Sequence, residues 1–362
     1  MKALKIGNLT IQIPIIQGGM GVGISLSGLA SAVANQGGVG VISSAGLGVI
    51  YKNLSTKYNE ASILGLREEL RKARAASKGV IGVNVMVAMS NFADMVKTSI
   101  AERADIIFSG AGLPLSLPSF LQKDSTTKLV PIVSSGRAAK LICEKWKSGY
   151  DYTPDAIVVE GPKAGGHLGY TVDQIDDEGH SLEHIVSDVV EVVREFESKN
   201  NCTIPVIAGG GIYSGEDIAS IMKLGASGVQ MGTRFVTTHE CDADAAFKQT
   251  YIDAKESDIE IIQSPVGMPG RAIKGTFLDR VKQGITIPKN CPFDCIKTCK
   301  VDRSPYCIMV ALYNAFRGRL ERGYAFAGSN AWRAEKIESV KELFASLKSE
   351  YETAVSAVAK RE

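Results

Sequence analysis

The chain alternates short runs of β-branched residues with helix-length amphipathic stretches from its start to about residue 255. Strands that are apolar along their whole length are typical of a parallel sheet covered by helices. Eight such βα repeats predict an α/β fold, a closed (β/α)₈ or TIM barrel. The expected strands are 13–17, 39–42, 81–86, 106–109, 129–133, 156–159, 205–208 and 228–231. The expected helices are 26–35, 65–76, 92–103, 138–147, 185–196, 215–224 and 243–254.

An open doubly wound sheet is the competing architecture. Its usual Gly-x-Gly-x-x-Gly fingerprint at the start of the first helix is missing, although the glycine-rich segment 18–23 follows the first expected strand. In a barrel, functional groups gather where the strands end, and the glycine-rich segments of this chain fall at those ends. The positions of the glycines therefore favour the barrel.

Two segments exceed what a minimal barrel needs. The first, 47–64, extends the loop after the second strand and forms either a functional loop or a surface excursion with an extra helix. The second begins after residue 283 and contains most of the cysteines, followed by helical patterns at 308–322 and 335–360. We therefore expect a (β/α)₈ barrel domain at 1–283 and a C-terminal, cysteine-containing helical extension at 284–362 that packs on it.

Composition excludes several classes of partner. The net charge is +2 with 22% charged residues, so no strong field attracts nucleic acid or an anionic membrane. The chain lacks an apolar run of about 18 residues, the length that spans a bilayer, and its first residues do not read as a signal peptide. We expect a cytoplasmic protein that binds small molecules. A homo-oligomer is compatible with these numbers.

Two glycine segments follow the seventh and eighth expected strands. Gly209-Gly210-Gly211 precedes a helical pattern, and Gly232-Thr233 comes directly after the eighth strand. Backbone N–H groups of glycine can approach a phosphate because no Cβ intervenes, and a following helix N-terminus adds a favourable field. Tight turns would explain either segment alone, but barrels commonly bind phosphate after these two strands. The pair predicts a phosphate site.

A single histidine lies in the glycine-rich segment 160–169, after the sixth expected strand. An unperturbed imidazole has a pKa of about 6.5, so it exchanges a proton at cellular pH without extreme tuning. A loop histidine bonded to a nearby carbonyl is the structural alternative. The position at the end of a barrel strand predicts that His167 is the catalytic acid or base.

The ordered motifs resemble those of the nitronate monooxygenases, formerly called 2-nitropropane dioxygenases, and of the related FMN-dependent enoyl-acyl-carrier-protein reductases of type II. The resemblance covers most of the chain, and it is the whole ordered set that makes it specific. It rests on the segments 14–20, 82–86, 164–167, 232–235, 264–271 and 327–330.

The resemblance implies an FMN-bearing barrel. The phosphate would be held by Gly209 to Gly211 and by Gly232-Thr233, and the flavin ring would lie near the first strand. Ser329 and Asn330 would return to the pocket, although capping of a helix that starts at 331 explains them equally well. The residues implied to lie near the flavin are Gly18, Gly19, Met20, Asn84, Glu160, Gly165 and Gly166.

Two positions depart from the family pattern. A lysine often found on the fifth strand has no counterpart here, because Ile132-Val133-Ser134-Ser135 stands in its place. Lys163 replaces the acidic residue that is usual shortly before the histidine. The first change removes one flavin contact, and the second alters the charge beside His167.

The resemblance implies two activities that use the same pocket. In the first, an alkyl nitronate is oxidised with FMN and oxygen to a carbonyl compound and nitrite, and His167 either deprotonates a neutral nitroalkane or holds the anionic nitronate. In the second, NAD(P)H is the reductant, the substrate is an enoyl thioester, and an acyl-carrier protein is a partner. A non-catalytic flavin-binding protein is a third class, in which a histidine at the barrel mouth would have no use.

Four of the seven cysteines crowd into one segment. Cys291, Cys295, Cys299 and Cys307 form the pattern C-x₃-C-x₃-C-x₇-C. Four converging thiolates hold a [4Fe–4S] cluster or a tetrahedral zinc ion, and in a helix the first three would share one face. A cluster would allow ferredoxin to supply electrons. A group of unligated, buried thiols is the remaining alternative.

Overall fold

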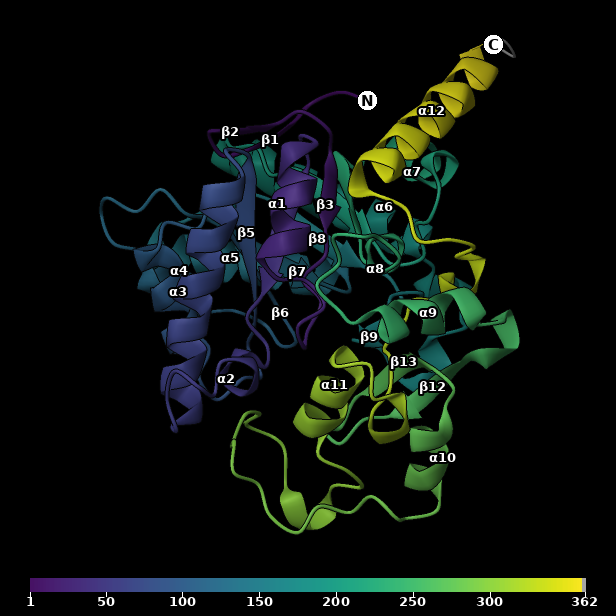
Figure 1. Ribbon diagram of the computed structural model, residues 1–362. Coiled ribbons are helices and arrows are strands. Elements are labelled where there is room, and N and C mark those ends of the chain that lie inside the picture. Colours follow the sequence, from purple (N-terminus) through teal and green to yellow (C-terminus); the bar gives the residue numbers. More distant parts are fainter. Residues whose placement is uncertain (360–362) are drawn as a thin grey trace.

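The chain forms a closed eight-stranded parallel barrel surrounded by helices, as predicted (Figure 1). A computed structural model describes residues 1–359. Each expected strand is present, with bounds that differ from the expected ones by no more than two residues. Around the barrel the strands are β3 (Ile15–Gln17), β4 (Val39–Ser43), β5 (Val80–Met86), β6 (Ile106–Gly110), β7 (Lys128–Val133), β8 (Ile157–Glu160), β10 (Val206–Gly209) and β11 (Gly228–Met231), which pairs with β3 again.

The helices cover the outside of the barrel because their apolar faces pack on the outward-facing strand residues. All seven expected helices are present. The last expected pattern, 335–360, begins later than predicted, and Lys360 lies outside the described residues. The helices are α1 (Ser27–Asn35), α2 (Leu47–Ile50), α3 (Tyr58–Ala76), α4 (Phe92–Ala101), α5 (Gly136–Tyr150), α6 (Leu182–Asn200), α7 (Gly215–Lys223), α8 (Thr233–Val236), α9 (Ala245–Asp253), α10 (Thr276–Lys282), α11 (Ile308–Phe316) and α12 (Val340–Ala359).

One end of the barrel is closed by a hairpin that the sequence analysis did not predict. Strands β1 (Leu4–Ile6) and β2 (Leu9–Ile11) pair antiparallel. Leu4 and Ile6 pack against inward-facing barrel residues such as Phe108, in one buried apolar cluster. Because this plug fills the amino-terminal end of the strands, a ligand can enter the barrel only from the opposite end.

A second small sheet lies over that opposite end. Strands β12 (Ile259–Gln263) and β13 (Pro269–Ile273) form an antiparallel hairpin, and β13 pairs with β9 (Gly166–His167), the two-residue strand in the loop after β8. This sheet was also not predicted. It matters because it fixes the backbone of the candidate catalytic histidine.

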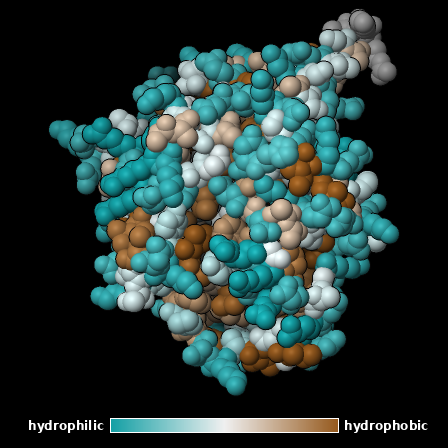
Figure 2. Space-filling view, in the orientation of Figure 1, coloured by the Kyte–Doolittle hydropathy of each residue, from teal (hydrophilic) through white to brown (hydrophobic). Residues whose placement is uncertain are grey.

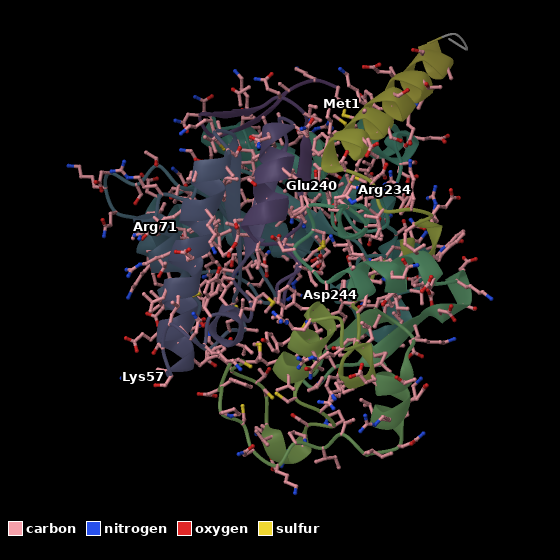
Figure 3. The ribbon with its side chains drawn as sticks, viewed as in Figure 1. Met1, Lys57, Arg71, Arg234, Glu240 and Asp244 are labelled. Atoms are coloured by element: carbon pink, nitrogen blue, oxygen red, sulfur yellow. The ribbon has the colours of Figure 1, made fainter. Side chains whose placement is uncertain are left out.

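The C-terminal region returns across the barrel mouth before it packs on the outside. α11 lies near the mouth and α12 runs beside α7 (Figure 1). Arg234 and Glu240, both labelled in Figure 3, join this region to the barrel: Arg234 pairs with Glu338 at 3.2 Å, and a Glu240 oxygen accepts from the Val340 amide at 3.0 Å. The division between domains at residue 283 stays a prediction.

The loop at 47–64 forms an extra helical layer. It contains α2 and the first turns of α3, so the alternative of an added helix is the one observed.

The short 3₁₀ helices are Leu117–Phe120, Val172–Gln174, Glu178–His180, Glu256–Asp258, Val301–Arg303, Leu320–Arg322 and Ala331–Arg333. No helix in the described residues is both long and apolar enough to cross a membrane.

The surface shown in Figure 2 is mostly hydrophilic, with apolar side chains gathered in its central hollows and at its lower edge. Among the exposed apolar residues, Ile285 and Ile287 belong to the irregular segment after α10.

Candidate active site

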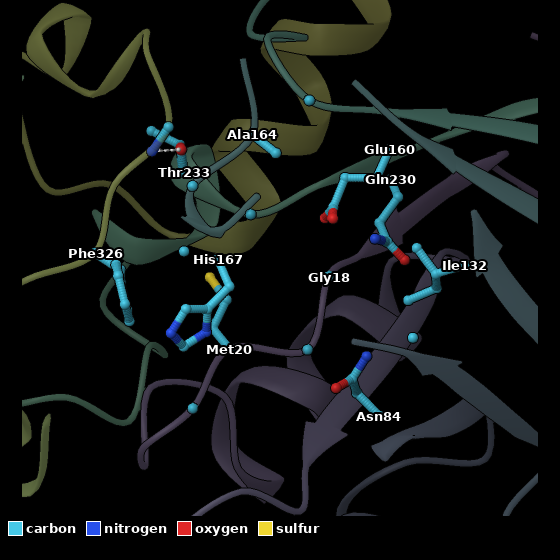
Figure 4. Close-up of a pocket in the computed structure, with 18 of the residues that line it drawn as sticks. Gly18, Met20, Asn84, Ile132, Glu160, Ala164, His167, Gln230, Thr233 and Phe326 are labelled. Atoms are coloured by element: carbon cyan, nitrogen blue, oxygen red, sulfur yellow. Dashed lines mark hydrogen bonds between the residues drawn. The ribbon is translucent and has the colours of Figure 1, made fainter. Parts of the chain in front are cut away.

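A cavity of about 430 Å³ lies at the C-terminal ends of the barrel strands. This volume is within the range of about 300–1,000 Å³ that is usual for sites of small molecules and cofactors. The structure brings nearly all the predicted site residues to its wall (Figure 4). Those residues are Gly18, Gly19, Met20, Asn84, Glu160, Gly165, Gly166, His167, Gly210, Gly211, Gly232, Thr233, Ser329 and Asn330.

Gly209 is the exception. It is the last residue of β10, it is buried in the sheet, and its carbonyl accepts from the Gly161 amide at 2.9 Å. Its amide and carbonyl therefore belong to the barrel and not to the cavity. The candidate phosphate site, called the amide seat below, begins at Gly210, one residue later than predicted.

The seat itself is made of unpaired backbone amides. Within residues 1–359, the N–H groups of Gly210, Gly211 and Gly232 donate to no acceptor of the chain, and all three residues line the cavity. Gly210 and Gly211 have φ angles of +97° and +87°, which favour glycine. Amides that face a cavity without partners are suited to an anionic ligand.

The helix that follows this seat contributes less than expected. The Gly215 amide at the start of α7 donates to Glu350 Oε2 at 2.7 Å, and the Asp217 amide donates to its own cap, Ser214 Oγ, at 3.2 Å. These amides are thus satisfied within the protein. The predicted contribution of the α7 N-terminus is corrected, because a carboxylate from α12 occupies it.

A segment from the C-terminal region closes over the seat. The Gly328 amide donates to Thr233 Oγ1 at 3.2 Å, and Asn330 Nδ2 donates to the Gly211 carbonyl at 2.7 Å. Between them, Ser329 Oγ is buried and has no hydrogen-bond partner in the described residues. A buried hydroxyl without a partner is costly, so this atom marks a place where a polar ligand group fits.

The floor of the cavity is formed by the ends of β3, β5 and β11. A Cβ at Gly19 would overlap the Cβ of Asn84, so only glycine lets this backbone lie flat against the asparagine. The Gln230 side chain also points into the cavity (Figure 4) and was not predicted as a site residue. Ile132 lines the wall in place of the family lysine, so it adds apolar surface where a cation is usual.

His167 is held by the small sheet above the barrel. The Leu168 amide donates to the Pro269 carbonyl at 2.9 Å, and His167 Nε2 lies 2.7 Å from Ser264 Oγ. The imidazole packs edge-on against Phe326, with 5.0 Å between ring centroids. Burial lowers the pKa of His167 to about 4. The expectation of an unperturbed imidazole is therefore wrong, because desolvation disfavours the charged form.

The neighbouring carboxyl is perturbed in the opposite direction. Glu160 ends β8 and points into the cavity near Gln230 (Figure 4). Its carboxyl has no hydrogen-bond partner in the described residues, and burial raises its pKa to about 7. Burial thus favours the uncharged form of both side chains.

Glu160→Gln is expected to make the ligand-free protein more stable at high pH. The pKa of Glu160 is raised from 4.5 to about 7 in the folded state, so the stability it contributes is present below pH 4.5 and is lost as the pH rises toward 7. The variant lacks this loss, and its advantage in free energy of unfolding should grow by about 2–3 kcal/mol between pH 5 and pH 8. Chemical denaturation at both pH values measures it, and parallel curves would contradict the shift.

A further part of the wall is apolar and aromatic. Phe247 and Tyr251 come from α9 and Leu312 from α11, the others come from loops, and the sequence analysis assigned none of them to the site. They are Val22, Ile24, Leu113, Phe247, Tyr251, Met268, Leu312, Tyr324 and Phe326. An apolar wall of this kind accommodates a hydrocarbon portion of a substrate.

The cysteine segment is not helical, which corrects the arrangement considered for it. It is irregular except for a bridge between Ile296 and Met89 and the short 3₁₀ helix Val301–Arg303. Cys291 is exposed, Cys295 is buried, and Cys299 and Cys307 are half-buried. Burial, with smaller contributions from the three other thiols, raises the pKa of Cys295 to about 12.

The four thiols are therefore near one another without forming a ligand set. Across residues 1–359, no group of three or more His, Cys, Asp or Glu side chains is placed to hold a metal ion. Iron and zinc analysis of protein purified without oxygen tests the metal prediction directly.

Comparisons with known proteins agree with this geometry. The family model described as nitronate monooxygenase matches residues 2–350. A probable nitronate monooxygenase of Staphylococcus aureus (strain JH9) is 28% identical over an alignment of 299 residues, and the match covers 76% of this chain and 79% of the relative. FabK from Thermotoga maritima has a similar structure, with a TM-score of 0.74 and 26% identity over 97% of this chain and 96% of that chain.

A third relative carries a different name. The (3aS,4S,5R,7aS)-5-hydroxy-7a-methyl-1-oxo-octahydro-1H-indene-4-carboxyl-CoA dehydrogenase of Mycobacterium tuberculosis is 26% identical over 274 residues. The match covers 76% of this chain and 66% of the relative, just under two thirds of its length.

Proposed function

The chain belongs to the nitronate monooxygenase family and is an oxidoreductase, and on that premise we propose that it binds FMN and oxidises alkyl nitronates to carbonyl compounds and nitrite. The observation that carries the proposal is the combination of unpaired backbone amides and a histidine in one cavity. The amides suit the phosphate of a cofactor, and His167, which lines the same cavity, would meet the substrate.

The residues of the seat fit the phosphate of FMN. The amides of Gly210, Gly211 and Gly232 are free to donate, and Ser329 Oγ is a buried hydroxyl that needs a partner. Gly19 and Asn84, which pack against each other in the cavity wall, would lie beside the flavin ring. When bound, FMN would supply the electron transfer between substrate and oxygen, and the protein would supply orientation and exclusion of water.

Each of the remaining residues then has a defined task. His167 would bind the substrate beside the ring, and its packing against Phe326 would keep the imidazole in one orientation. Glu160 and Gln230 would contact the polar edge of the flavin, since both point into the cavity. Arg271 donates to the carbonyls of Pro162 and Ala164 at 2.6 and 2.8 Å, and thereby positions the loop that leads to His167.

Reduction of an enoyl thioester is the second candidate function. The observation that favours it is the apolar and aromatic wall, which exceeds what a small nitronate requires, and the likeness to FabK agrees with it. In this alternative NAD(P)H would be the reductant and a carrier-bound or coenzyme-bound acyl chain would occupy the wall. The thioester carbonyl would take the place of the nitro group at His167.

A steady-state assay separates the two candidates. Nitrite release with oxygen uptake from a nitronate supports the first, and NAD(P)H oxidation that depends on an enoyl thioester supports the second. A protein that binds FMN and shows neither activity would support the third class, a non-catalytic flavin-binding protein.

Ser329→Ala is expected to have opposite effects on the free and the loaded protein. Without FMN the change removes an unpaired buried hydroxyl, so the free energy of unfolding should stay constant or rise by about 1 kcal/mol. With FMN it removes a hydrogen bond to a charged group, so the affinity for FMN should fall by about 10-fold. Denaturation of the flavin-free protein and titration with FMN measure the two effects. Unchanged FMN affinity would remove Ser329 from the phosphate site.

A further inference from the structure

The hydroxyl of Ser264 forms a side-chain hydrogen bond with the imidazole of His167. Ser264 lies in the turn between β12 and β13 and is 3% exposed. Its Oγ lies 2.7 Å from His167 Nε2 and also accepts a longer bond of 3.4 Å from the Val266 amide. In the described residues, His167 Nδ1 has no partner in the chain, and the residue lines the cavity. Nε2 is therefore committed to the protein, and Nδ1 is left for a ligand.

The protons of this contact can be assigned by counting donors and acceptors. If Nε2 carried the proton, Ser264 Oγ would receive two N–H donors, and its own proton would have no acceptor inside a buried turn. Such an unpaired buried donor is costly. If Ser264 donates to Nε2 instead, each group is satisfied. A neutral imidazole that accepts at Nε2 carries its proton on Nδ1.

We propose that Ser264 is a positioning residue that holds His167 in the neutral tautomer protonated on Nδ1, so that His167 donates a hydrogen bond to a substrate oxygen and does not remove a proton from carbon. This inference rests on the proposed function for the identity of the oxygen. For a nitronate it belongs to the anionic nitro group, and for an enoyl thioester it is the carbonyl oxygen.

The proposal specifies which form of the substrate the protein takes. Of the two roles considered for His167, deprotonation of a neutral nitroalkane needs a free lone pair facing the substrate. The assigned tautomer presents an N–H there. The preferred substrate is therefore a nitronate that has already ionised in solution, and the neutral nitroalkane should be used poorly.

Nitrogen NMR of protein with isotopically labelled histidine reads the tautomer without reference to activity. The chain has only 4 histidines, and His167→Gln identifies the signal of His167. At pH 7 we expect Nδ1 to be protonated and Nε2 to be unprotonated. In Ser264→Ala the signals should move toward the tautomer with the proton on Nε2, and in Ser264→Thr they should stay, because the hydroxyl is retained. A protonated Nε2 in the unchanged protein would overturn the proposal, whatever the enzyme's activity.

Kinetics with the flavin-loaded enzyme provide the second measurement. We expect kcat/KM for the pre-ionised nitronate to exceed that for the matching neutral nitroalkane by at least about 10-fold, and Ser264→Ala to lower the nitronate value by about 3–10-fold. Ser264→Thr should restore it. Ser99→Ala, which removes another buried serine hydroxyl far from the cavity, controls for a general effect on packing. Equal use of both substrate forms, or no loss in Ser264→Ala, would contradict the proposal. If neither substrate reacts, the proposed function fails while the NMR result still decides the tautomer.

Discussion

His167→Ala is expected to lower kcat/KM by about 10²–10³-fold while FMN remains bound. The loss follows from the removal of a donor that faces the substrate inside a cavity where water is largely excluded and electrostatic interactions are strong. FMN should be retained because the imidazole contacts Ser264 and Phe326 and takes no part in the amide seat. Steady-state kinetics with nitronate, together with the flavin spectrum of the purified variant, measure both quantities.

His184→Ala is the matched control, because His184 is an exposed residue of α6 that does not line the cavity. It should leave both kcat/KM and flavin content unchanged. His167→Gln keeps an N–H donor of similar reach and should recover part of the lost activity. An alanine variant at position 167 with normal kcat/KM and bound FMN would show that the histidine is only structural.

The barrel could be predicted because its signal is local and repeated. Each strand is a short run such as Val39-Gly40-Val41-Ile42, buried on both faces, and every barrel strand except β6 is followed by an α-helix. Parallel strands alternating with helices allow few arrangements. The glycine segments could be placed at the barrel mouth for the same reason, since every one of them directly follows a strand.

The sheet above the mouth could not be predicted, because its pairing is not local. β9 consists of two residues, and its partner β13 lies about a hundred residues further along the chain. A strand this short has no periodicity, and only the tertiary structure brings Ser264 to His167. Ser264 belongs to the segment 264–271, on which the family resemblance rests, but nothing in that segment assigned Ser264 a role.

Shifts in pKa were also beyond the sequence, because they depend on burial. His167 and Glu160 are seven residues apart, and their neighbours in the sequence do not indicate a shifted pKa. Both side chains face a poorly solvated cavity, which lowers the pKa of His167 and raises that of Glu160. The cysteines show the same limit. Their spacing suits a ligand set, but the irregular path of the segment places one of them in solvent and another in the core.

Gly210→Ala is expected to weaken FMN binding by about 10²–10³-fold. A residue other than glycine is strained at the φ angle of +97°, and the added Cβ would lie 2.8 Å from the Gly161 carbonyl oxygen and 3.1 Å from its amide nitrogen. These are backbone atoms of the loop after β8, so they cannot rotate away as a side chain would. Relief of the clash must move the Gly210 and Gly211 amides away from the phosphate, and both hydrogen bonds weaken together. Titration of the flavin-free protein with FMN measures the affinity.

Gly284→Ala separates the loss of the seat from the cost of the backbone angle. Gly284 also has a positive φ, of +74°, but no atom lies within 4 Å of the added Cβ, and the residue is outside the cavity wall. It should destabilise the protein by about 1 kcal/mol, the cost of the left-handed conformation for an L-residue, and leave FMN affinity unchanged. If Gly210→Ala behaved like this control and bound FMN normally, the phosphate would have to be held elsewhere, and the amides of Gly210 and Gly211 would need another explanation for having no acceptor in the described part of the chain.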